Sequence, residues 1–277
     1  MKIVFRVDAS TQMGIGHVMR CLTLAKALKA NSDEVEFICR AHQGNLIDKI
    51  KIIGFNVYVL KLESQNKPEK KLAHSNWLGE TQKNDAIYCS NILKNIQPDW
   101  LIIDHYGIDE DWELVLRDYC RKIMVIDDLS DRKHQCDVLL DQTFGCQKIN
   151  YSYLVPETCK LLLGSKYVLL RPEFLKWRKY SLARRNSNAL KNILINMGGT
   201  DPDNTTGKIL DEFAIFEHID NIKITIIMGK DSPHLESVNS KSKRLFYNSD
   251  VKVNVDNMAE IMANSDLAIG ASGSTSL

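Results

Sequence analysis

The chain has 277 residues, 44% of them hydrophobic, and a formal net charge of +1 at pH 7. A chain of this length is expected to form two compact domains. Its 36 basic side chains are matched by 35 acidic ones. This balance disfavours a nucleic-acid-binding protein, because such proteins concentrate Lys and Arg on one face. No nucleic-acid partner is therefore expected.

Signals for secretion or membrane insertion are weak. Arg6 and Asp8 interrupt the first apolar run, too early for the core of a signal peptide. No stretch approaches the roughly 18 consecutive apolar residues of a membrane span. The cysteines are odd in number and include no Cys-x-x-Cys pair, which favours reduced thiols over a disulfide framework. We expect a cytoplasmic monomer with no membrane partner.

In the first half of the chain, short β-branched runs alternate with stretches of helical periodicity, as in βα units with a parallel sheet. Apolar residues recur at helical spacing from Val18 to Leu28 and, more briefly, from Leu114 to Tyr119. The predicted strands are residues 3–7, 35–39, 55–60, 100–104, 123–127 and 138–141.

The same pattern then runs a second time. Pro172 marks the start of a helix, and a further helix is expected to begin near Asn204. The predicted strands of this second series are residues 192–197, 222–228 and 267–269.

The doubled pattern predicts an α/β fold with two Rossmann-like domains facing a cleft. We place an N-terminal domain at residues 1–150, a connecting segment at 151–190 and a nucleotide-binding domain at 191–277. The last strand runs into a turn of small residues, and the chain stops at Leu277 before another helix. The second domain is therefore expected to be incomplete, either because the chain is a fragment or because this domain is unusually small.

The first βα turn carries Gly14 and Gly16 and opens directly into an amphipathic helix. Backbone N–H groups at a helix start suit an anionic or polar ligand. The third glycine of a dinucleotide-binding motif is Met19 here, which disfavours a hydride-transfer cofactor. His17 lies at the positive end of the helix, which favours a neutral imidazole that can act as a base. A histidine that merely caps the helix or packs there is the alternative.

A second group of polar residues follows the predicted strand at 100–104. Its side chains are expected at the carboxyl edge of the sheet, beside the first glycine turn. Tyr106 could hydrogen-bond substrate or orient water, whereas His105 is equally explained by a structural role. Asp127 and Asp128 follow another strand, but adjacent carboxylates point to different sides and this sequence is typical of a turn and helix cap. We do not predict a metal site there.

Two glycine-rich turns end strands of the second series. The first contains Gly198, Gly199 and Thr200, and the second contains Ser272, Gly273, Ser274 and Thr275. Each repeats the geometry of an anion site, and two such turns at one sheet edge suit a diphosphate. Simple tight turns are the alternative for each.

Patterns typical of metal or nucleophile sites are missing from the sequence. The seven histidines have no partner four residues away, no Cys/His cluster occurs, and no Gly-x-Ser-x-Gly elbow is present. We therefore expect acid–base chemistry without a metal ion.

Taken together, the motifs resemble the UDP-2,4-diacetamido-2,4,6-trideoxy-β-L-altropyranose hydrolases of pseudaminic acid biosynthesis, and the resemblance spans the whole chain. Single motifs also occur in the inverting glycosyltransferase that makes lipid II. The residues that carry the resemblance are Arg6-Val-Asp8, Gly14-Ile-Gly16-His17-Val-Met-Arg20-Cys-Leu, Trp77-Leu-Gly79, Asp104-His-Tyr106-Gly107, Asp127-Asp128, Leu169-Leu-Arg171-Pro-Glu173-Phe174, Met197-Gly-Gly-Thr-Asp201 and Gly270-Ala-Ser-Gly-Ser-Thr275.

The resemblance implies a glycosyltransferase-B-like architecture that binds the sugar toward the N-terminal domain and UDP toward the C-terminal one, without a cofactor. The family's catalytic histidine maps onto His17, as base for the attacking water, and its active-site tyrosine onto Tyr106. The implied substrate-binding residues are Asp8, Gly14, Gly16, Arg20, Gly198, Gly199, Thr200, Ser272, Gly273, Ser274 and Thr275.

The implied reaction is metal-independent, inverting hydrolysis of the UDP-sugar by attack of water at the anomeric carbon. Two alternatives remain open. One is an inverting UDP-sugar glycosyltransferase of the same fold, and the other is a non-catalytic module or remnant that binds a sugar nucleotide.

Overall fold

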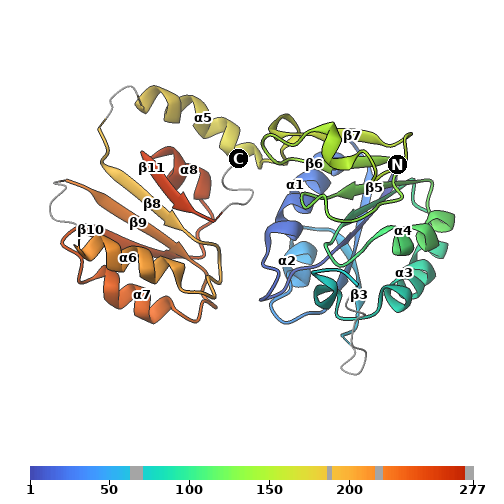
Figure 1. Cartoon of the computed structure of the whole chain (residues 1–277), viewed down its shortest axis with the longest axis horizontal. Helices are drawn as coiled ribbons and strands as arrows, with labels where there is room; N and C mark the ends of the chain where they lie inside the picture. Colours follow the sequence, from blue (N-terminus) through green and yellow to red (C-terminus); the bar gives the residue numbers. More distant parts are fainter. Residues whose placement is uncertain (63–70, 186–188, 216–220, 272–277) are drawn as a thin grey trace. The chain divides into compact units, whose positions relative to one another are not determined.

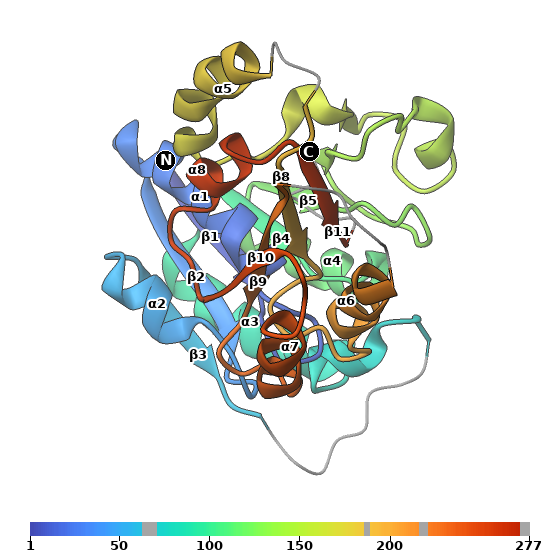
Figure 2. The same cartoon turned by 90° about the vertical axis from the view of Figure 1, so that its left-hand side faces the viewer.

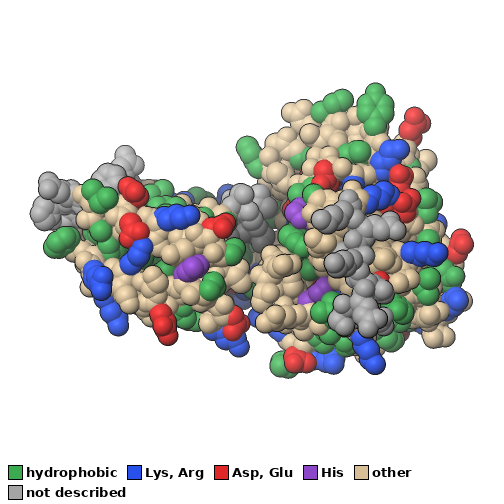
Figure 3. Space-filling model, turned by 60° about the horizontal axis from the view of Figure 1, so that its bottom comes forward, with side chains coloured by type: hydrophobic (Ala, Val, Ile, Leu, Met, Phe, Trp, Pro, Cys, Tyr) green, Lys and Arg blue, Asp and Glu red, His purple; other side chains and the backbone are tan. Residues whose placement is uncertain are grey.

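The computed structural model describes residues 1–62, 71–185, 189–215 and 221–271. The chain divides into two compact units, the first covering Met1–Leu169 and the second beginning at Leu170 (Figure 1). On the face that Figure 3 presents, basic and acidic side chains are interspersed on both units. No helix in the described part of the chain is long and apolar enough to cross a membrane.

The first unit is built on a sheet of seven parallel strands in the order β3-β2-β1-β4-β5-β6-β7. All six strands predicted for this half are confirmed. The seventh, β7, is an additional edge strand that pairs with β6. The strands are β1 Lys2–Val7, β2 Glu34–Arg40, β3 Asn56–Leu60, β4 Trp100–Asp104, β5 Lys122–Ile126, β6 Val138–Asp141 and β7 Lys160–Leu163.

Helices cover both faces of this sheet (Figure 1). Side chains of β1 alternate between the faces, so Phe5 packs in the core with α1 and α2, whereas Val4 packs in the core with α3 and α4. The helices of this unit are α1 Gly16–Ala30, α2 Ile47–Ile52, α3 Gln82–Ile96 and α4 Glu110–Leu116, with short 3-10 turns η1 Ser75–Leu78, η2 Arg117–Tyr119, η3 Lys148–Tyr151 and η4 Ser165–Tyr167.

The second unit has a sheet of four parallel strands in the order β10-β9-β8-β11. Helices α6 and α7 lie along one face, and α5 and α8 lie along the other (Figures 1 and 2). The elements are α5 Pro172–Arg184, β8 Asn192–Asn196, α6 Thr205–Ile215, β9 Lys223–Met228, α7 Leu235–Ser242, β10 Asn248–Val253, α8 Met258–Ala263 and β11 Leu267–Gly270.

The segment expected to connect the domains, residues 151–190, is divided between the two units. β7 pairs with β6 of the first sheet, while α5 is held to the second unit by Arg184. The Arg184 guanidinium donates to the Ala263 carbonyl at 3.1 Å and to the Ser265 carbonyl at 2.7 Å, and its Nη1 lies 2.7 Å from Asp266 Oδ1. Each half of the segment thus packs on its own sheet.

A fully buried charge cluster, formed by Arg6, Arg40, Asp8 and Asp85, joins α3 to the sheet. Asp85 on α3 accepts from Arg6 Nη2 at 2.8 Å and from Arg40 Nη2 at 2.7 Å. Trp112 Nε1 on α4 also donates to Asp85, at 2.9 Å. Burial alone would raise the pKa of Asp85, but the two guanidinium groups lower it. The carboxylate therefore stays charged and ties α3 and α4 to β1 and β2.

Replacing Asp85 with Asn should destabilise the protein by about 3–5 kcal/mol, because two buried arginines then lose the charge that compensates them. Urea unfolding followed by near-UV circular dichroism measures this change. Arg121→Ala is the matched control, because the Arg121 side chain is 82% exposed and its ion pair with Asp99 lies on the surface. That variant should unfold as the wild type does. A wild-type unfolding midpoint for Asp85→Asn would show that the cluster does not stabilise the fold.

Candidate active site

The sheet order of the first unit creates a switch point between β1 and β4. The chain moves outward from β1 through β2 to β3, and then returns to β4 on the other side of β1. Loops that follow the two strands at such a point diverge and leave a crevice at the carboxyl edge of the sheet. His17 follows β1, and Asp104 and Tyr106 end or follow β4. The predicted neighbourhood of the first glycine turn and Tyr106 is confirmed.

His17 is paired with a buried carboxylate. Its Nδ1 lies 2.6 Å from Asp104 Oδ1, and the Asp104 side chain is fully buried. An ionised carboxylate only accepts hydrogen bonds, so the proton is on Nδ1 and the lone pair is on Nε2. A histidine oriented in this way can remove a proton through Nε2, and the carboxylate stabilises the cation that results.

Arg20 keeps Asp104 ionised. It lies three residues after His17 on the same face of α1, and it donates from Nε to Asp104 Oδ2 at 2.6 Å and from Nη2 to Oδ1 at 2.7 Å. Burial favours the neutral acid, but the charge of Arg20 and the hydrogen bonds from Arg20 and His17 outweigh it and hold the pKa of Asp104 far below its ordinary value. Asp104 is therefore an anion at any pH at which the protein would work.

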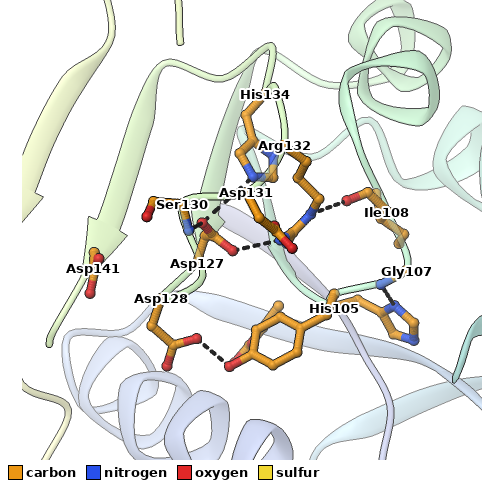
Figure 4. Close-up of polar contacts among 12 residues, drawn as sticks. His105, Gly107, Ile108, Asp127, Asp128, Ser130, Asp131, Arg132, His134 and Asp141 are labelled. Carbon is orange, nitrogen blue, oxygen red and sulfur yellow. Dashed lines mark hydrogen bonds and ion pairs between the residues drawn. The ribbon is translucent and has the colours of Figure 1, made fainter. Parts of the chain in front are cut away.

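Asp128 is a second acid of the site. Its Oδ2 accepts from Arg20 Nη1 at 2.7 Å, and its Oδ1 accepts the hydroxyl proton of Tyr106. Figure 4 shows Asp127 and Asp128 pointing in different directions, as the sequence predicts. Asp127 accepts from the Ser130 N–H at 3.0 Å, which is the expected turn. The expected helix cap is wrong, because the described chain continues from this turn to β6 without a helix.

Tyr106 lies directly against His17. The two rings meet edge to face, with centroids 4.5 Å apart. Burial and the neighbouring Asp128 carboxylate raise the pKa of Tyr106 well above its ordinary value. The phenol is therefore protonated throughout the neutral range.

Two further aromatic rings border the site. Trp77 in η1 stacks on Tyr106 with centroids 5.7 Å apart, and His74 lies 4.4 Å from Trp77 by the same measure. Both side chains are half-buried. Gly79 lets the chain turn here, because its φ is +67° and a Cβ would lie 2.7 Å from His42. Trp77 belongs to one of the motifs that carry the resemblance. Neither Trp77 nor His74 was predicted from the sequence to be a site residue.

The first glycine turn, which directly precedes His17 in the sequence, has open space around its two glycines. Gly14 has a φ of +75°, and no heavy atom lies within 4 Å of a Cβ built on Gly14 or Gly16. Within the turn, the Gly14 N–H donates to the Ser10 carbonyl at 2.9 Å. A ligand therefore has room to approach the backbone at the start of α1.

Asp8 lies beneath the site and is 1% exposed. Its Oδ1 accepts from the Arg40 N–H at 2.6 Å and pairs with Arg6 at 2.7 Å. His105 is buried too, with its Nε2 3.4 Å from Asp8 Oδ2 and its Nδ1 accepting from the Gly107 N–H at 3.0 Å. These contacts give His105 the structural role that the sequence left open. Substrate contact by Asp8 stays a prediction, because the contacts described for it lie within the protein.

The second glycine turn is exposed and follows β8 at the switch point of the second sheet, between β8 and β11. Gly198 has a φ of +90°. Gly229 donates to the Gly199 carbonyl at 2.9 Å and is so close that a Cβ on it would lie 2.4 Å from that oxygen. The turn is therefore packed directly on the backbone that follows β9.

The start of α6 differs from the expected anion cradle. The Asp201 carboxylate accepts from the N–H groups of Thr205 at 2.9 Å and Thr206 at 2.8 Å. The helix start is thus capped from within, and an anion would meet the exposed turn at Gly198, Gly199 and Thr200 instead. The other predicted turn, with Ser272, Gly273, Ser274 and Thr275, lies outside the described residues.

Among the described residues, no group of His, Cys, Asp and Glu side chains has the geometry to hold a metal ion. A cavity of about 830 Å³ lies at the opposite, amino edge of the first sheet. It is lined by side chains of both signs, including Lys2, Asp99, Asp118 and Arg121.

Solved structures confirm the glycosyltransferase-B-like fold class. MurG of Acinetobacter baumannii is similar with a TM-score of 0.63 and 14% identity, over 99% of this chain and 74% of that one. The UDP-GlcNAc 2-epimerase of Neisseria meningitidis, bound to UDP-GlcNAc, has a TM-score of 0.61 and 12% identity, over 99% and 78% of the two chains. At these identities the likeness concerns the fold alone.

Sequence comparison identifies the family. No family model matches the chain. An uncharacterized protein of Methanocaldococcus jannaschii is 34% identical over 99% of this chain, which spans only 52% of that relative. The UDP-2,4-diacetamido-2,4,6-trideoxy-β-L-altropyranose hydrolase of Campylobacter jejuni is 32% identical, over 98% of this chain and 85% of its own length. The chain belongs to the family of this hydrolase.

Proposed function

We propose that the protein hydrolyses a UDP-linked 2,4-diacetamido-2,4,6-trideoxy sugar to UDP and the free sugar, in pseudaminic acid biosynthesis. The observation that carries this proposal is the His17–Asp104 pair, whose Nδ1 and Oδ1 atoms are 2.6 Å apart, directly after a glycine turn with open space around Gly14 and Gly16. Membership of the hydrolase family supports the choice of substrate.

In this mechanism His17 Nε2 takes a proton from a water molecule. The water oxygen attacks the anomeric carbon from the face opposite UDP, and the carbon–oxygen bond to UDP breaks with its electron pair leaving on the diphosphate. The configuration at the carbon inverts, and the proton on His17 is later released to solvent. Asp104 stabilises the transient imidazolium, a contribution typical of a carboxylate–histidine pair.

Arg20 acts in this proposal through its neighbours rather than on the sugar. Its Nε, Nη1 and Nη2 all donate to Asp104 or Asp128, and its side chain is only 6% exposed. Binding of substrate by Arg20, which the resemblance implies, stays a prediction. In the mechanism proposed here, Arg20 instead positions Asp104 and Asp128.

The nucleotide is assigned to the second unit. The Gly198 N–H donates to Asn196 Oδ1 at 3.3 Å, and the N–H groups of Gly199 and Thr200 are the ones that this proposal assigns to a diphosphate. Donors fixed in this way stabilise the negative charge that grows on UDP as the bond breaks. The Neisseria meningitidis epimerase of similar fold was solved with UDP-GlcNAc bound, which supports a UDP-sugar as the ligand.

The proposal predicts that the purified chain releases UDP from UDP-2,4-diacetamido-2,4,6-trideoxy-β-L-altropyranose without an acceptor, as followed by ³¹P NMR. In ¹⁸O-labelled water the label should enter the sugar and leave UDP unlabelled, because water attacks carbon. Label in UDP would contradict attack at carbon. UDP release that requires an added acceptor would identify a glycosyltransferase instead.

His17→Asn and Asp104→Asn should each lower kcat by about 10²- to 10⁴-fold. The first removes the base, and the second offers an N–H to Nδ1 and so favours the tautomer without a lone pair on Nε2. Calorimetry should show unchanged UDP binding in both. Asp111→Asn is the matched control, because the Asp111 carboxylate is 67% exposed on α4. Near-normal turnover by His17→Asn would remove this residue from the mechanism.

Gly229→Ala should weaken UDP binding by about tenfold or more. The new Cβ cannot be accommodated 2.4 Å from the Gly199 carbonyl, so the turn must move. Calorimetry with UDP measures the loss. Ser240→Ala, which removes an exposed hydrogen bond within α7, should bind UDP normally. Unchanged affinity in a folded Gly229→Ala protein would exclude this turn from the nucleotide site.

A further inference from the structure

One guanidinium connects the two groups assigned to catalysis. Arg20 donates to Asp104, which accepts from His17, and it also donates to Asp128, which accepts from Tyr106. Arg20 is 6% exposed and Asp104 is fully buried, while Asp128 is 22% exposed. The series of contacts starts at one catalytic ring and ends at the other, and the two rings then meet directly.

The direction of each hydrogen bond in this series is determined by its chemistry. Arginine can only donate, and an ionised carboxylate can only accept. The protons on His17 Nδ1 and on the Tyr106 hydroxyl are therefore both directed at carboxylates. The atoms left for a ligand, His17 Nε2 and Tyr106 Oη, then both present lone pairs.

We propose that Asp128 is a positioning residue that makes Tyr106 a hydrogen-bond acceptor, so that Tyr106 and His17 together select a nucleophile with two protons, water, over an alcohol. This inference rests on the proposed hydrolysis and deepens it. Water can donate one proton to each acceptor and still direct a lone pair at the anomeric carbon. An alcohol has a single O–H and would leave one acceptor without a partner.

Tyr106 is held firmly in this orientation. Trp77 stacks on its ring, and the Arg132 guanidinium lies 5.6 Å from the ring centroid. Arg132 is itself fixed, because its Nη1 pairs with Asp127 at 2.8 Å and its Nε donates to the Ile108 carbonyl at 2.8 Å (Figure 4). The hydroxyl therefore remains beside Asp128, and the Tyr106 ring lies edge to face against the His17 ring.

Asp128→Asn is the variant that reverses this polarity while conserving shape. Asparagine has one oxygen and one NH₂ group, and the oxygen must face the Arg20 guanidinium because two donors repel. The NH₂ group then faces Tyr106, which accepts its hydrogen bond and turns its own proton toward the nucleophile. An alcohol now fits, accepting from Tyr106 and donating to His17.

The test is the product ratio in water–methanol mixtures, with UDP-2,4-diacetamido-2,4,6-trideoxy-β-L-altropyranose as substrate and ¹H NMR as the readout. If methanol and water competed equally, the fraction of product that is methyl glycoside would equal the mole fraction of methanol, which is called its molar share here. The wild type should form methyl glycoside at less than about a tenth of this share. Asp128→Asn should lose about 10- to 100-fold in kcat, with a smaller change in KM, and should form methyl glycoside near that share. Adding Tyr106→Phe to Asp128→Asn should cost less than the same change costs the wild type.

Tyr106→Phe provides a second measurement should Asp128→Asn fail to fold. It removes one acceptor, so its share of methyl glycoside should also rise. Asp131→Asn is the control from the same loop. The Asp131 carboxylate is 45% exposed, and its described ion pair is with Arg132. That variant should keep the wild-type product ratio.

Methyl glycoside in proportion to methanol from the wild type would overturn the proposal. So would an unchanged product ratio in both folded variants, Asp128→Asn and Tyr106→Phe. Neither result would affect the proposed hydrolysis, which fails separately if the wild type releases no UDP.

Discussion

The buried carboxylate of Asp104 is the group on which the geometry of the site depends. It lies at the last position of β4 and is fully shielded from water. An unpaired ion in such a place costs several kcal/mol, of the order of 5, so it persists only because Arg20 contacts both of its oxygens. Asp104 in turn holds the imidazole of His17 in one tautomer and one orientation. The orientation of the proposed base, His17, is therefore determined by a carboxylate that is fully buried.

The order of the strands explains why these groups meet. His17 and Arg20 lie on the first helix, after β1, whereas Asp104 ends β4 and Asp128 follows β5. β4 is the direct neighbour of β1, and β5 is the next strand outward. In a parallel sheet all of these strand ends lie at one edge. The second sheet repeats the arrangement with β8 and β11 at its switch point, which is why an exposed glycine turn follows β8.

A second set of buried charges lies under the site and has a structural role. Arg6, Asp8, Arg40 and Asp85 compensate one another and attach α3 to the sheet. The two sets of buried charges differ in the residues at which their contacts end. The contacts described for the lower set lie within the protein, whereas the upper set ends in His17 and Tyr106, whose rings lie against each other. The resemblance groups Asp8 with the substrate-binding residues, and that role stays a prediction; the contacts described for Asp8 are those of the lower set.

The sequence by itself determined the elements whose signals are local. β1, α1 and the glycine turn between them follow from β-branched runs, helical spacing and two glycines, and Tyr106 follows from its place after a buried strand. The edge strands β7 and β10 and the polar helix α3 were missed. β7 has only four residues, β10 is largely polar in sequence, and α3 turns only a narrow stripe, including Ala86, Cys89 and Leu93, toward the core. Their stability comes from neighbours rather than from their own composition.

Only the tertiary structure decided which charges are partners. Arg20 is 84 residues from Asp104 and 108 residues from Asp128, and nothing in the local pattern links them. The Asp127–Asp128 pair looked like a turn with a cap, and the turn is present, but Asp128 gains its role from Arg20 and Tyr106. A carboxylate acquires a definite function only when the fold removes water from around it and leaves particular donors in its place. Packing across the sheet determines which donors surround the carboxylate, so the sequence of a single segment cannot predict them.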